Sequence, residues 1–128
     1  MIIQMKKAKS EEVWRALYGA ATFIPVAGKV IVAVDEDIDP SNLYDVIWAM
    51  GTRCDVENIE ILRGIWSAMT PPLVKPQLKA GKFPVSSRAV VDACRPYDWM
   101  KEFPPVNVFT REYKRGIAEK FGIQMKKK

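Results

Sequence analysis

The sequence predicts a single α/β domain with a mainly parallel or mixed β-sheet of about four strands, flanked by about three helices. Segments with strand and helix patterns alternate along the first half of the chain, which favours right-handed crossovers. The apolar run from Lys29 to Val34 is rich in β-branched side chains, as in a strand covered on both faces. With 128 residues and 48% hydrophobic content, the chain can bury one core. We expect the domain to span 1–125, followed by a basic tail at 126–128.

The first elements are a short strand and a helix. Residues 2–6 predict the opening strand, and Ser10 suits the N-cap of a helix whose first turn carries Glu11 and Glu12. Pro25 and Gly28 end this helix. Its apolar positions recur at helical spacing and predict one stripe packed on a sheet, formed by Val13, Leu17, Ala20, Ala21 and Ile24.

The second strand and helix follow directly. Residues 29–34 predict a central strand, and Asp39 before Pro40 predicts an N-cap with proline at the first helical position. The helix is expected to be amphipathic, with a stripe at positions i, i+3, i+4 and i+7 formed by Leu43, Val46, Ile47 and Met50.

The second half of the chain is less regular. Residues 59–62 predict a third strand and residues 89–93 a fourth, while prolines and lysines between 64 and 84 indicate a long loop that is ordered or partner-dependent. Further prolines at 96, 104 and 105 keep the chain irregular. Thr110 is expected to cap a last helix that ends at Gly122 and presents Tyr113, Ile117 and Phe121 on one face.

Composition excludes several classes of site. Histidine is absent, which removes the commonest general base and zinc ligand, and two cysteines forty positions apart form no metal-binding pair. The net charge of +5 includes the three terminal lysines, and basic and aromatic residues do not interleave as in a nucleic-acid surface. No apolar segment approaches the roughly 20 residues that span a bilayer. We expect a reduced, cytoplasmic protein with no nucleic-acid or membrane partner.

Four carboxylates follow the central strand at Asp35, Glu36, Asp37 and Asp39. One hypothesis is a Mg²⁺-dependent phosphohydrolase, because Asp35 and Asp37 have the D-x-D spacing of haloacid dehalogenase-type enzymes and Mg²⁺ prefers carboxylate oxygens. The second hypothesis is a structural turn in which Asp39 caps the helix and Arg53 pairs with one carboxylate. The residues following Asp37 depart from the phosphatase pattern.

The block from residue 28 to residue 54 resembles the C-terminal domain of the UbiD-like decarboxylases. That family has an apolar strand, a D-[DE]-D-I-D turn, a helix with V-x-W-A and a closing T-R, and all four occur here in order. The resemblance extends to residues 1–7, to the proline-rich stretch 71–74, to 87–94 and to the last helix. Members use prenylated FMN to decarboxylate, and sometimes carboxylate, aromatic and α,β-unsaturated acids.

The resemblance implies a small subunit of a split enzyme. The family's flavin pocket, divalent-metal and potassium sites and acid-base residues lie in parts of the protein that match nothing here, so no catalytic, cofactor-binding or metal-binding residue is carried over. Prenylated FMN and its metals are expected on a larger catalytic partner, with this chain in a homo- or hetero-oligomer.

The C-terminal domain of the family forms an interface and covers part of the substrate pocket, which makes Leu73 and Val74 the candidates for substrate-facing positions. The acidic residues and Arg53 are then a structural turn and cap. A non-enzymatic assembly module and the phosphohydrolase remain alternatives. Neither the substrate nor the direction of the reaction follows from this chain.

Overall fold

The computed structural model describes residues 1–23, 26, 28–104 and 109–124. Its strands are β1 (Ile2–Met5), β2 (Val30–Asp35), β3 (Ile59–Trp66) and β4 (Val85–Ala93). Its α-helices are α1 (Glu11–Phe23), α2 (Leu43–Arg53), α3 (Lys75–Lys79) and α4 (Arg111–Phe121), with short 3₁₀ turns η1 (Val56–Asn58), η2 (Pro72–Val74) and η3 (Tyr97–Trp99). The predicted α/β class is confirmed.

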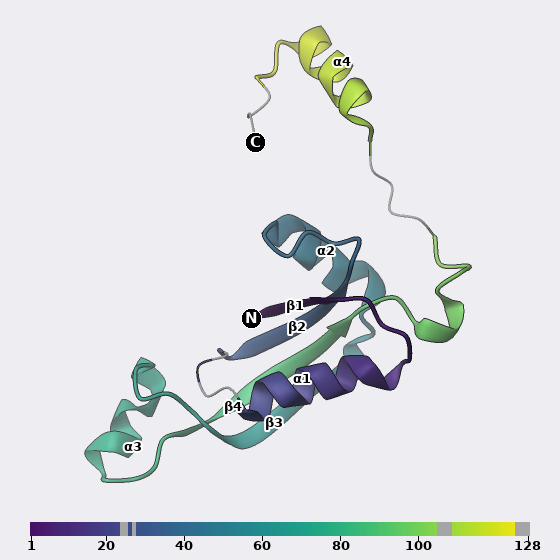
Figure 1. The fold of residues 1–128 in the computed structure, drawn as a ribbon. Coiled ribbons are helices and arrows are strands. Elements are labelled where there is room, and N and C mark those ends of the chain that lie inside the picture. The colour runs from purple at the N-terminus through teal and green to yellow at the C-terminus, as the bar shows by residue number, and fades with distance from the viewer. Residues whose placement is uncertain (24–25, 27, 105–108, 125–128) are drawn as a thin grey trace.

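The strands form one mixed sheet in the order β1-β2-β4-β3 (Figure 1). Strands β1, β2 and β4 are parallel, with Ile2 opposite Val32 and Val32 opposite Val91. The edge strand β3 runs antiparallel to β4. Strand β2 is therefore central, as predicted.

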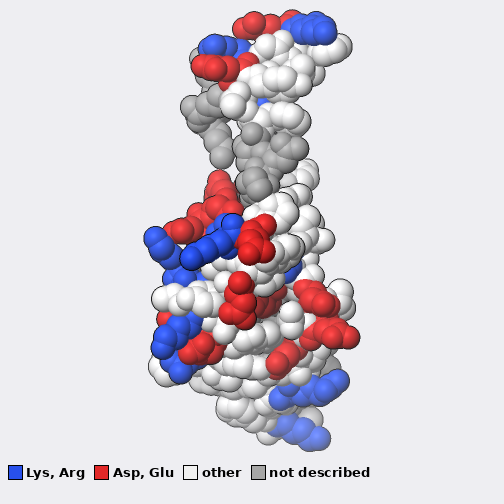
Figure 2. Space-filling model, turned by 90° about the vertical axis from the view of Figure 1, so that its right-hand side faces the viewer, with Lys and Arg blue, Asp and Glu red and all other residues white. Residues whose placement is uncertain are grey.

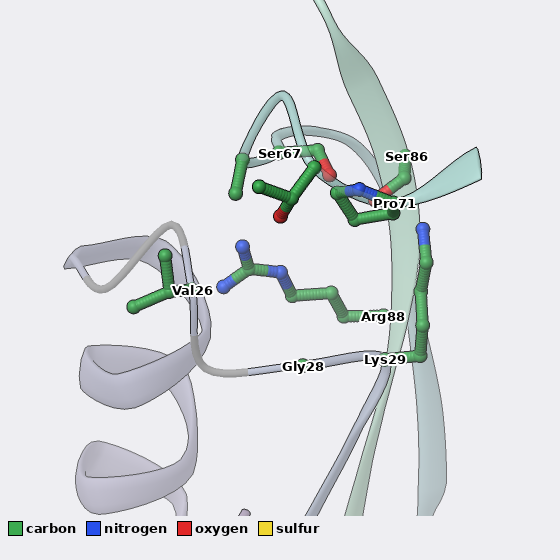
Figure 3. A pocket seen from close by; sticks show the side chains of 9 residues that line it. Val26, Gly28, Lys29, Ser67, Pro71, Ser86 and Arg88 are labelled. Carbon is green, nitrogen blue, oxygen red and sulfur yellow. The ribbon is translucent and has the colours of Figure 1, made fainter. Parts of the chain in front are cut away.

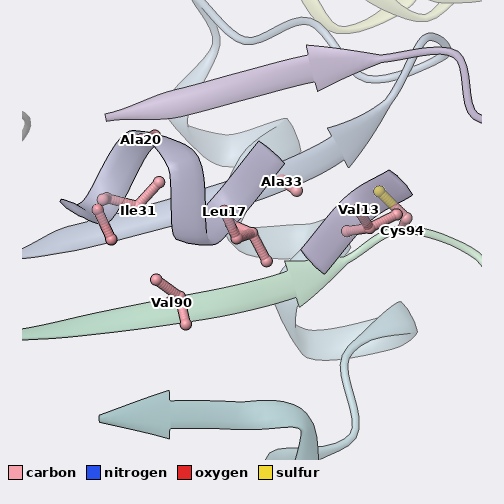
Figure 4. Close-up of a cluster of buried hydrophobic side chains, with 8 residues drawn as sticks. Val13, Leu17, Ala20, Ile31, Ala33, Val90 and Cys94 are labelled. Carbon is pink, nitrogen blue, oxygen red and sulfur yellow. The ribbon is translucent and has the colours of Figure 1, made fainter. Parts of the chain in front are cut away.

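Helices α1 and α2 cover opposite faces of the sheet (Figure 1). Successive side chains of a strand point to opposite faces, so Ile31 and Ala33 of β2 pack with α1, while Val32 and Val34 pack with α2. The buried side chains between α1 and the sheet form the first core cluster, and those between α2 and the sheet form the second. Figure 4 shows Leu17 of α1 among the side chains of the first cluster. Burial on both faces explains the uninterrupted apolar run.

The predicted cap of α2 is wrong by three residues. The helix begins at Leu43 and its N-cap is Asn42, whose side chain accepts a hydrogen bond from the Tyr44 backbone N–H. The Oδ1 of Asp39 instead accepts from the backbone N–H of Ser41 at 2.9 Å and from its hydroxyl at 2.6 Å. Asp39 thus stabilises the turn that precedes the helix. Short polar side chains favour such turns as well as helix N-caps, because they accept hydrogen bonds from nearby backbone N–H groups in both.

The buried face of α2 also differs from the predicted stripe. Val46 and Ala49 are buried together with Arg53, whereas Leu43 and Ile47 are 65% and 56% exposed. Because Ala49 is small, the helix can lie close to the sheet on this side. Arg53 lies four positions further on the same face of the helix and therefore also points inward. Leu43 and Ile47 then remain on the outer face, whereas Met50 is partly buried and packs against the core on this side of the sheet, as predicted.

The segment 64–84 contains more regular structure than the sequence predicted. Strand β3 continues to Trp66 through an irregularity between Leu62 and Ile65, at which Gly64 has a φ of 70°. Such a bulge breaks the period-2 pattern that identifies a strand. The connection to β4 then forms η2 and α3, and the Gln77 side chain exchanges two hydrogen bonds with the Val85 backbone at 2.9 and 2.8 Å.

The first and last helices follow their predicted signals. Helix α1 begins at Glu11, directly after Ser10, and the expected stripe residue Ile24 and terminator Pro25 lie outside the described residues. The Oγ1 of Thr110 accepts from the Tyr113 N–H at 3.2 Å, and Gly122 ends α4 with a left-handed φ of 62°. Pro105 and the predicted tail are also outside the described residues. No helix in the described ranges is long and apolar enough to cross a membrane.

Candidate functional site: a charged cluster at the carboxyl ends of the strands

Three parallel strands bring charged residues to one edge of the sheet. Asp35 is the last residue of β2, Lys7 follows β1 by two positions, and Arg95 follows β4 by two. Because carboxyl ends of parallel strands meet at the same edge, residues far apart in the sequence converge here. Arg53 reaches the same place from the end of α2. We call Lys7, Asp35, Asp37, Arg53 and Arg95 the charged cluster.

Asp35 lies at the centre of the cluster and is only 2% exposed. Its Oδ1 is 3.3 Å from the Lys7 Nζ. Its Oδ2 accepts from the Arg53 Nη1 at 3.0 Å, from the Arg95 backbone N–H at 2.7 Å and from the Arg95 Nε at 3.1 Å. The buried carboxylate is therefore neutralised by cations from three directions, as a buried charge requires.

Arg53 joins Asp35 to Asp37. Its Nη1 and Nη2 donate to the two carboxylate oxygens of Asp37 at 2.9 and 2.7 Å, a bidentate pair. The hydrogen bonds from Arg53 and its positive charge lower the pKa of Asp37. The same hydrogen bonds and the negative charge of Asp37 raise the pKa of Arg53, although burial opposes both shifts. The guanidinium also lies 5.4 Å from the centre of the Trp48 ring.

The cluster is an ion-pair network and not a metal centre in this geometry. The oxygens of Asp35 and Asp37 are directed at Lys7, Arg53 and Arg95, and a cation beside a divalent ion would be repelled. Among the described residues, no group of three or more His, Cys, Asp or Glu side chains could hold a metal ion. Nothing in this arrangement favours the phosphohydrolase hypothesis.

The remaining acidic residue, Glu36, lies outside the cluster. It is exposed and approaches only the Lys6 Nζ, at 3.9 Å, with both side chains largely in solvent. The turn around it is held instead by the Gln4 side-chain amide, which donates to the carbonyl oxygens of Glu36 and Ile38 at 3.1 and 2.8 Å. Ile38 is buried and anchors the turn in the second core cluster.

An open pocket of about 330 Å³ borders the cluster and is lined in part by Lys7, Trp14, Asp92 and Arg95. The Oδ1 of Asp92 accepts from the Cys94 N–H at 2.9 Å, and burial raises the pKa of this carboxyl. Burial likewise raises the pKa of the thiols of Cys94 and Cys54, and neither cysteine is in a disulfide. A raised pKa leaves these thiols protonated and poor nucleophiles.

The two predicted substrate-facing residues occupy different environments. Leu73 is 68% exposed on η2, whereas Val74 is fully buried beneath the same turn. In the chain by itself, Leu73 is therefore the accessible one of the two, and the substrate-facing role of both stays a prediction. The two residues are adjacent in η2, and their side chains point in different directions.

Both signs of charge are interspersed on the face drawn in Figure 2. Lysine and arginine side chains lie beside aspartate and glutamate, and the face has no single-sign field of the kind that attracts a nucleic-acid backbone. The net positive charge therefore does not define a basic surface on this side.

Together these features define an α/β domain whose sheet edge holds a buried ion-pair network. The chain belongs to the UbiD C-terminal domain family, that is, the C-terminal domain of 3-octaprenyl-4-hydroxybenzoate carboxy-lyase, whose family model matches residues 1–93. It is 34% identical over 79 residues to gallate decarboxylase of Lactiplantibacillus plantarum. That match covers 59% of this chain but only 16% of the decarboxylase.

Solved structures with a similar fold include a UbiD-class enzyme and two aromatic acid decarboxylases. The enzyme HmfF from Pelotomaculum thermopropionicum, solved with FMN, matches 87% of this chain and 24% of its own, with a TM-score of 0.71 and 23% identity. The 3,4-dihydroxybenzoic acid decarboxylase of Enterobacter cloacae matches 94% and 26%, with a TM-score of 0.67 and 26% identity. Vanillic acid decarboxylase of Sedimentibacter hydroxybenzoicus in its closed form matches 94% of this chain and 26% of its own, with a TM-score of 0.67 and 20% identity.

Proposed function

We propose that this chain is the small subunit of a split UbiD-like decarboxylase or carboxylase that acts on aromatic or α,β-unsaturated carboxylic acids. It supplies an oligomer interface and part of the cover of the substrate pocket. A larger subunit holds prenylated FMN, a divalent metal, potassium and the acid-base residues. The domain that performs this role extends over residues 1–125.

The observation that carries the proposal is the match of residues 1–93 to the UbiD C-terminal domain family, which belongs to a carboxy-lyase. The chain spans 16% of the gallate decarboxylase and about a quarter of the solved relatives. HmfF has been solved with FMN and, in an evolved dimeric form, with prFMN. The vanillic acid decarboxylase ShVdcCD has also been solved with a truncated ShVdcD. These relatives favour a flavin-bearing partner.

Exposed apolar side chains on α2 support a docking role. Leu43, Tyr44, Ile47 and Trp48 are exposed on the outer side of this helix and define what we call the α2 face. A contiguous exposed apolar surface costs free energy in water and is typical of protein–protein contact sites. Covering this surface would stabilise a complex.

Helix α4 supports the same interpretation. Tyr113, Ile117 and Phe121 lie at helical spacing and are exposed, and the ring of Phe109 stacks on Tyr113 with centroids 5.0 Å apart. In Figure 1 the helix stands away from the sheet. An amphipathic helix with an uncovered apolar stripe is suited to packing on another chain.

The remaining residues have more local roles in this proposal. Leu73 and Val74 are the candidates for substrate-facing positions, and Leu73 is the one exposed at the proline-rich turn. Asp35, Glu36, Asp37, Asp39 and Arg53 form the structural turn between β2 and α2, and none of them takes part in the chemical step.

The proposal is tested by comparing the purified chain with the assembly recovered from its native source. The chain alone is expected to lack flavin absorbance and to release no CO₂ from a panel of aromatic acids. The recovered assembly is expected to show both. Stoichiometric flavin binding and turnover by the chain alone would overturn the subunit role.

A further inference from the structure

A second cavity lies at the opposite edge of the sheet from the charged cluster. It has a volume of about 160 Å³ and lies where the amino ends of β2 and β4 meet the segment that follows β3 (Figure 3). A water molecule occupies about 30 Å³ of liquid, so the cavity has room for a small polyatomic ligand. No residue of the charged cluster lines it.

Lys29 places an uncompensated cation beside this cavity. Its side chain extends along one wall toward Ser86 and Pro71 (Figure 3), and its Nζ is buried without a hydrogen-bond partner among the described residues. A buried ammonium group normally has an anionic partner, because losing hydration without compensation is costly. The lining residues that the structure describes include no aspartate or glutamate.

Arg88 adds a second cation and is fixed in position. The residue is buried, and its Nη1 and Nη2 donate to the carbonyl oxygens of Ala21 and Trp66 at 2.6 and 2.9 Å. Figure 3 shows the guanidinium crossing the cavity below Ser67 and Pro71. Bonds to α1 and β3 thus hold the positive group in place before any ligand arrives, which lowers the entropic cost of binding.

Hydroxyl groups complete the polar lining. Ser67 is buried, and the side chains of Ser67, Thr70 and Ser86 lie around the cavity with the two cations. Hydroxyls donate hydrogen bonds to carboxylate and phosphate oxygens, and charge-assisted bonds from lysine and arginine to these oxygens are the stronger ones. The lining therefore suits an anion and would repel a metal cation.

We propose that this cavity is a binding site for a small oxyanion, a carboxylate or phosphate group, held by Lys29 and Arg88 with hydroxyl donors around it. The site is independent of the proposed decarboxylase role, since it uses neither the charged cluster nor the α2 face. An oxyanion supplies the counter-charge that Lys29 lacks within the described chain.

The test is thermal unfolding of the purified chain in sodium phosphate, sodium acetate or sodium chloride at matched pH and ionic strength. Phosphate, acetate or both are expected to raise the unfolding midpoint saturably above its value in chloride, and the comparison identifies which oxyanion is preferred. Lys29→Met should abolish this rise. Lys82→Met, which removes the same charge from an exposed position, should retain it.

An independent readout avoids dependence on the variant. In a titration of the unmodified protein observed by NMR, the amides of Ser67 and Ser86 are expected to shift saturably with phosphate or acetate and not with chloride. Equal midpoints in all three salts, or a rise that persists in Lys29→Met, would overturn the site. Shifts spread evenly over exposed lysines would do the same.

Discussion

At the scale of single residues, Asp35 is the counterion for cations from three different segments. Asp35→Asn would leave Lys7 and Arg53 buried with reduced compensation, and both side chains are almost fully enclosed. Removing one partner of a buried ion pair costs about 3–5 kcal/mol. We expect a loss of that order in the free energy of unfolding, measured with urea.

Glu36→Gln provides the matched control for Asp35→Asn. This neighbouring carboxylate makes only an exposed 3.9 Å pair with Lys6, so its removal should change stability by less than about 0.5 kcal/mol. Equal effects of the two substitutions would show that the buried network does not stabilise the fold.

The pKa of Asp37 predicts acid sensitivity. The Arg53 hydrogen bonds lower this pKa in the folded protein, so the carboxylate contributes stability above its unfolded pKa of about 4 and loses that contribution as pH falls through the folded value. Asp37→Asn should therefore reduce the fall in unfolding free energy between pH 5 and pH 2. An unchanged pH profile would contradict the Arg53 pairing.

The pKa of Asp92 shifts in the opposite direction to that of Asp37, so its effect on the pH dependence of stability is also opposite. Burial raises its pKa in the folded protein, so its contribution to stability is present at low pH and is lost as pH rises through the folded value. Asp92→Asn keeps an Oδ1 acceptor for the Cys94 N–H. The variant should be more stable than the unmodified protein at pH 7 and equally stable near pH 3, in denaturant unfolding at both pH values. A less stable variant at pH 7 would refute this.

Sequence analysis identified only part of the cluster. Arg53 was a predicted partner for one carboxylate because it lies near the end of the helix that follows the acidic turn, and the structure pairs it with two carboxylates. Lys7 and Arg95 were missed. Their partnership depends on β1 and β4 flanking β2, and this strand order is set by tertiary contacts that local sequence does not record. Two basic residues placed just beyond apolar strands were the available signal.

At the scale of elements, the proposed subunit role gives the two faces of α2 different tasks, folding for one and association for the other. Val46 faces the sheet and Ile47 belongs to the α2 face. Val46→Ala should cost on the order of 2 kcal/mol of unfolding free energy through lost burial and a cavity. Ile47→Ser should leave unfolding nearly unchanged but weaken assembly with the partner chain, as measured by its yield in affinity purification.

The two α2 substitutions act as controls for each other. If Ile47→Ser reduced stability as much as Val46→Ala while leaving assembly intact, the α2 face would be part of the core of this domain and would not be a docking surface.

The positions of the helices and strands in the sequence were more predictable than the side of a helix that is buried. The apolar run of β2 and the Thr110 and Gly122 signals of α4 are local, and these elements lie as predicted. The predicted stripe of α2 was right for Val46 and Met50 and wrong for Leu43 and Ile47, which fit a helical stripe as well as the buried residues do. A stripe that serves an interface has the same periodicity as one that serves a core. The bulge at Gly64 hid the second half of β3 for a comparable reason.

At the scale of the whole molecule, the structure combines a well-buried two-sided sheet with apolar surfaces that the described chain leaves open. The sheet and its charged cluster account for folding, and the proposed subunit role assigns association to the α2 face and α4. This division is what the proposed subunit role requires of a UbiD C-terminal domain.

Native mass spectrometry of the protein recovered from its own source, with an absorbance spectrum of the same sample, tests the subunit role most directly. We predict a complex of this chain with a larger chain, carrying the absorbance of a modified flavin. A colourless monomer or homo-oligomer under conditions that preserve weak complexes would contradict the role and favour a non-enzymatic assembly module.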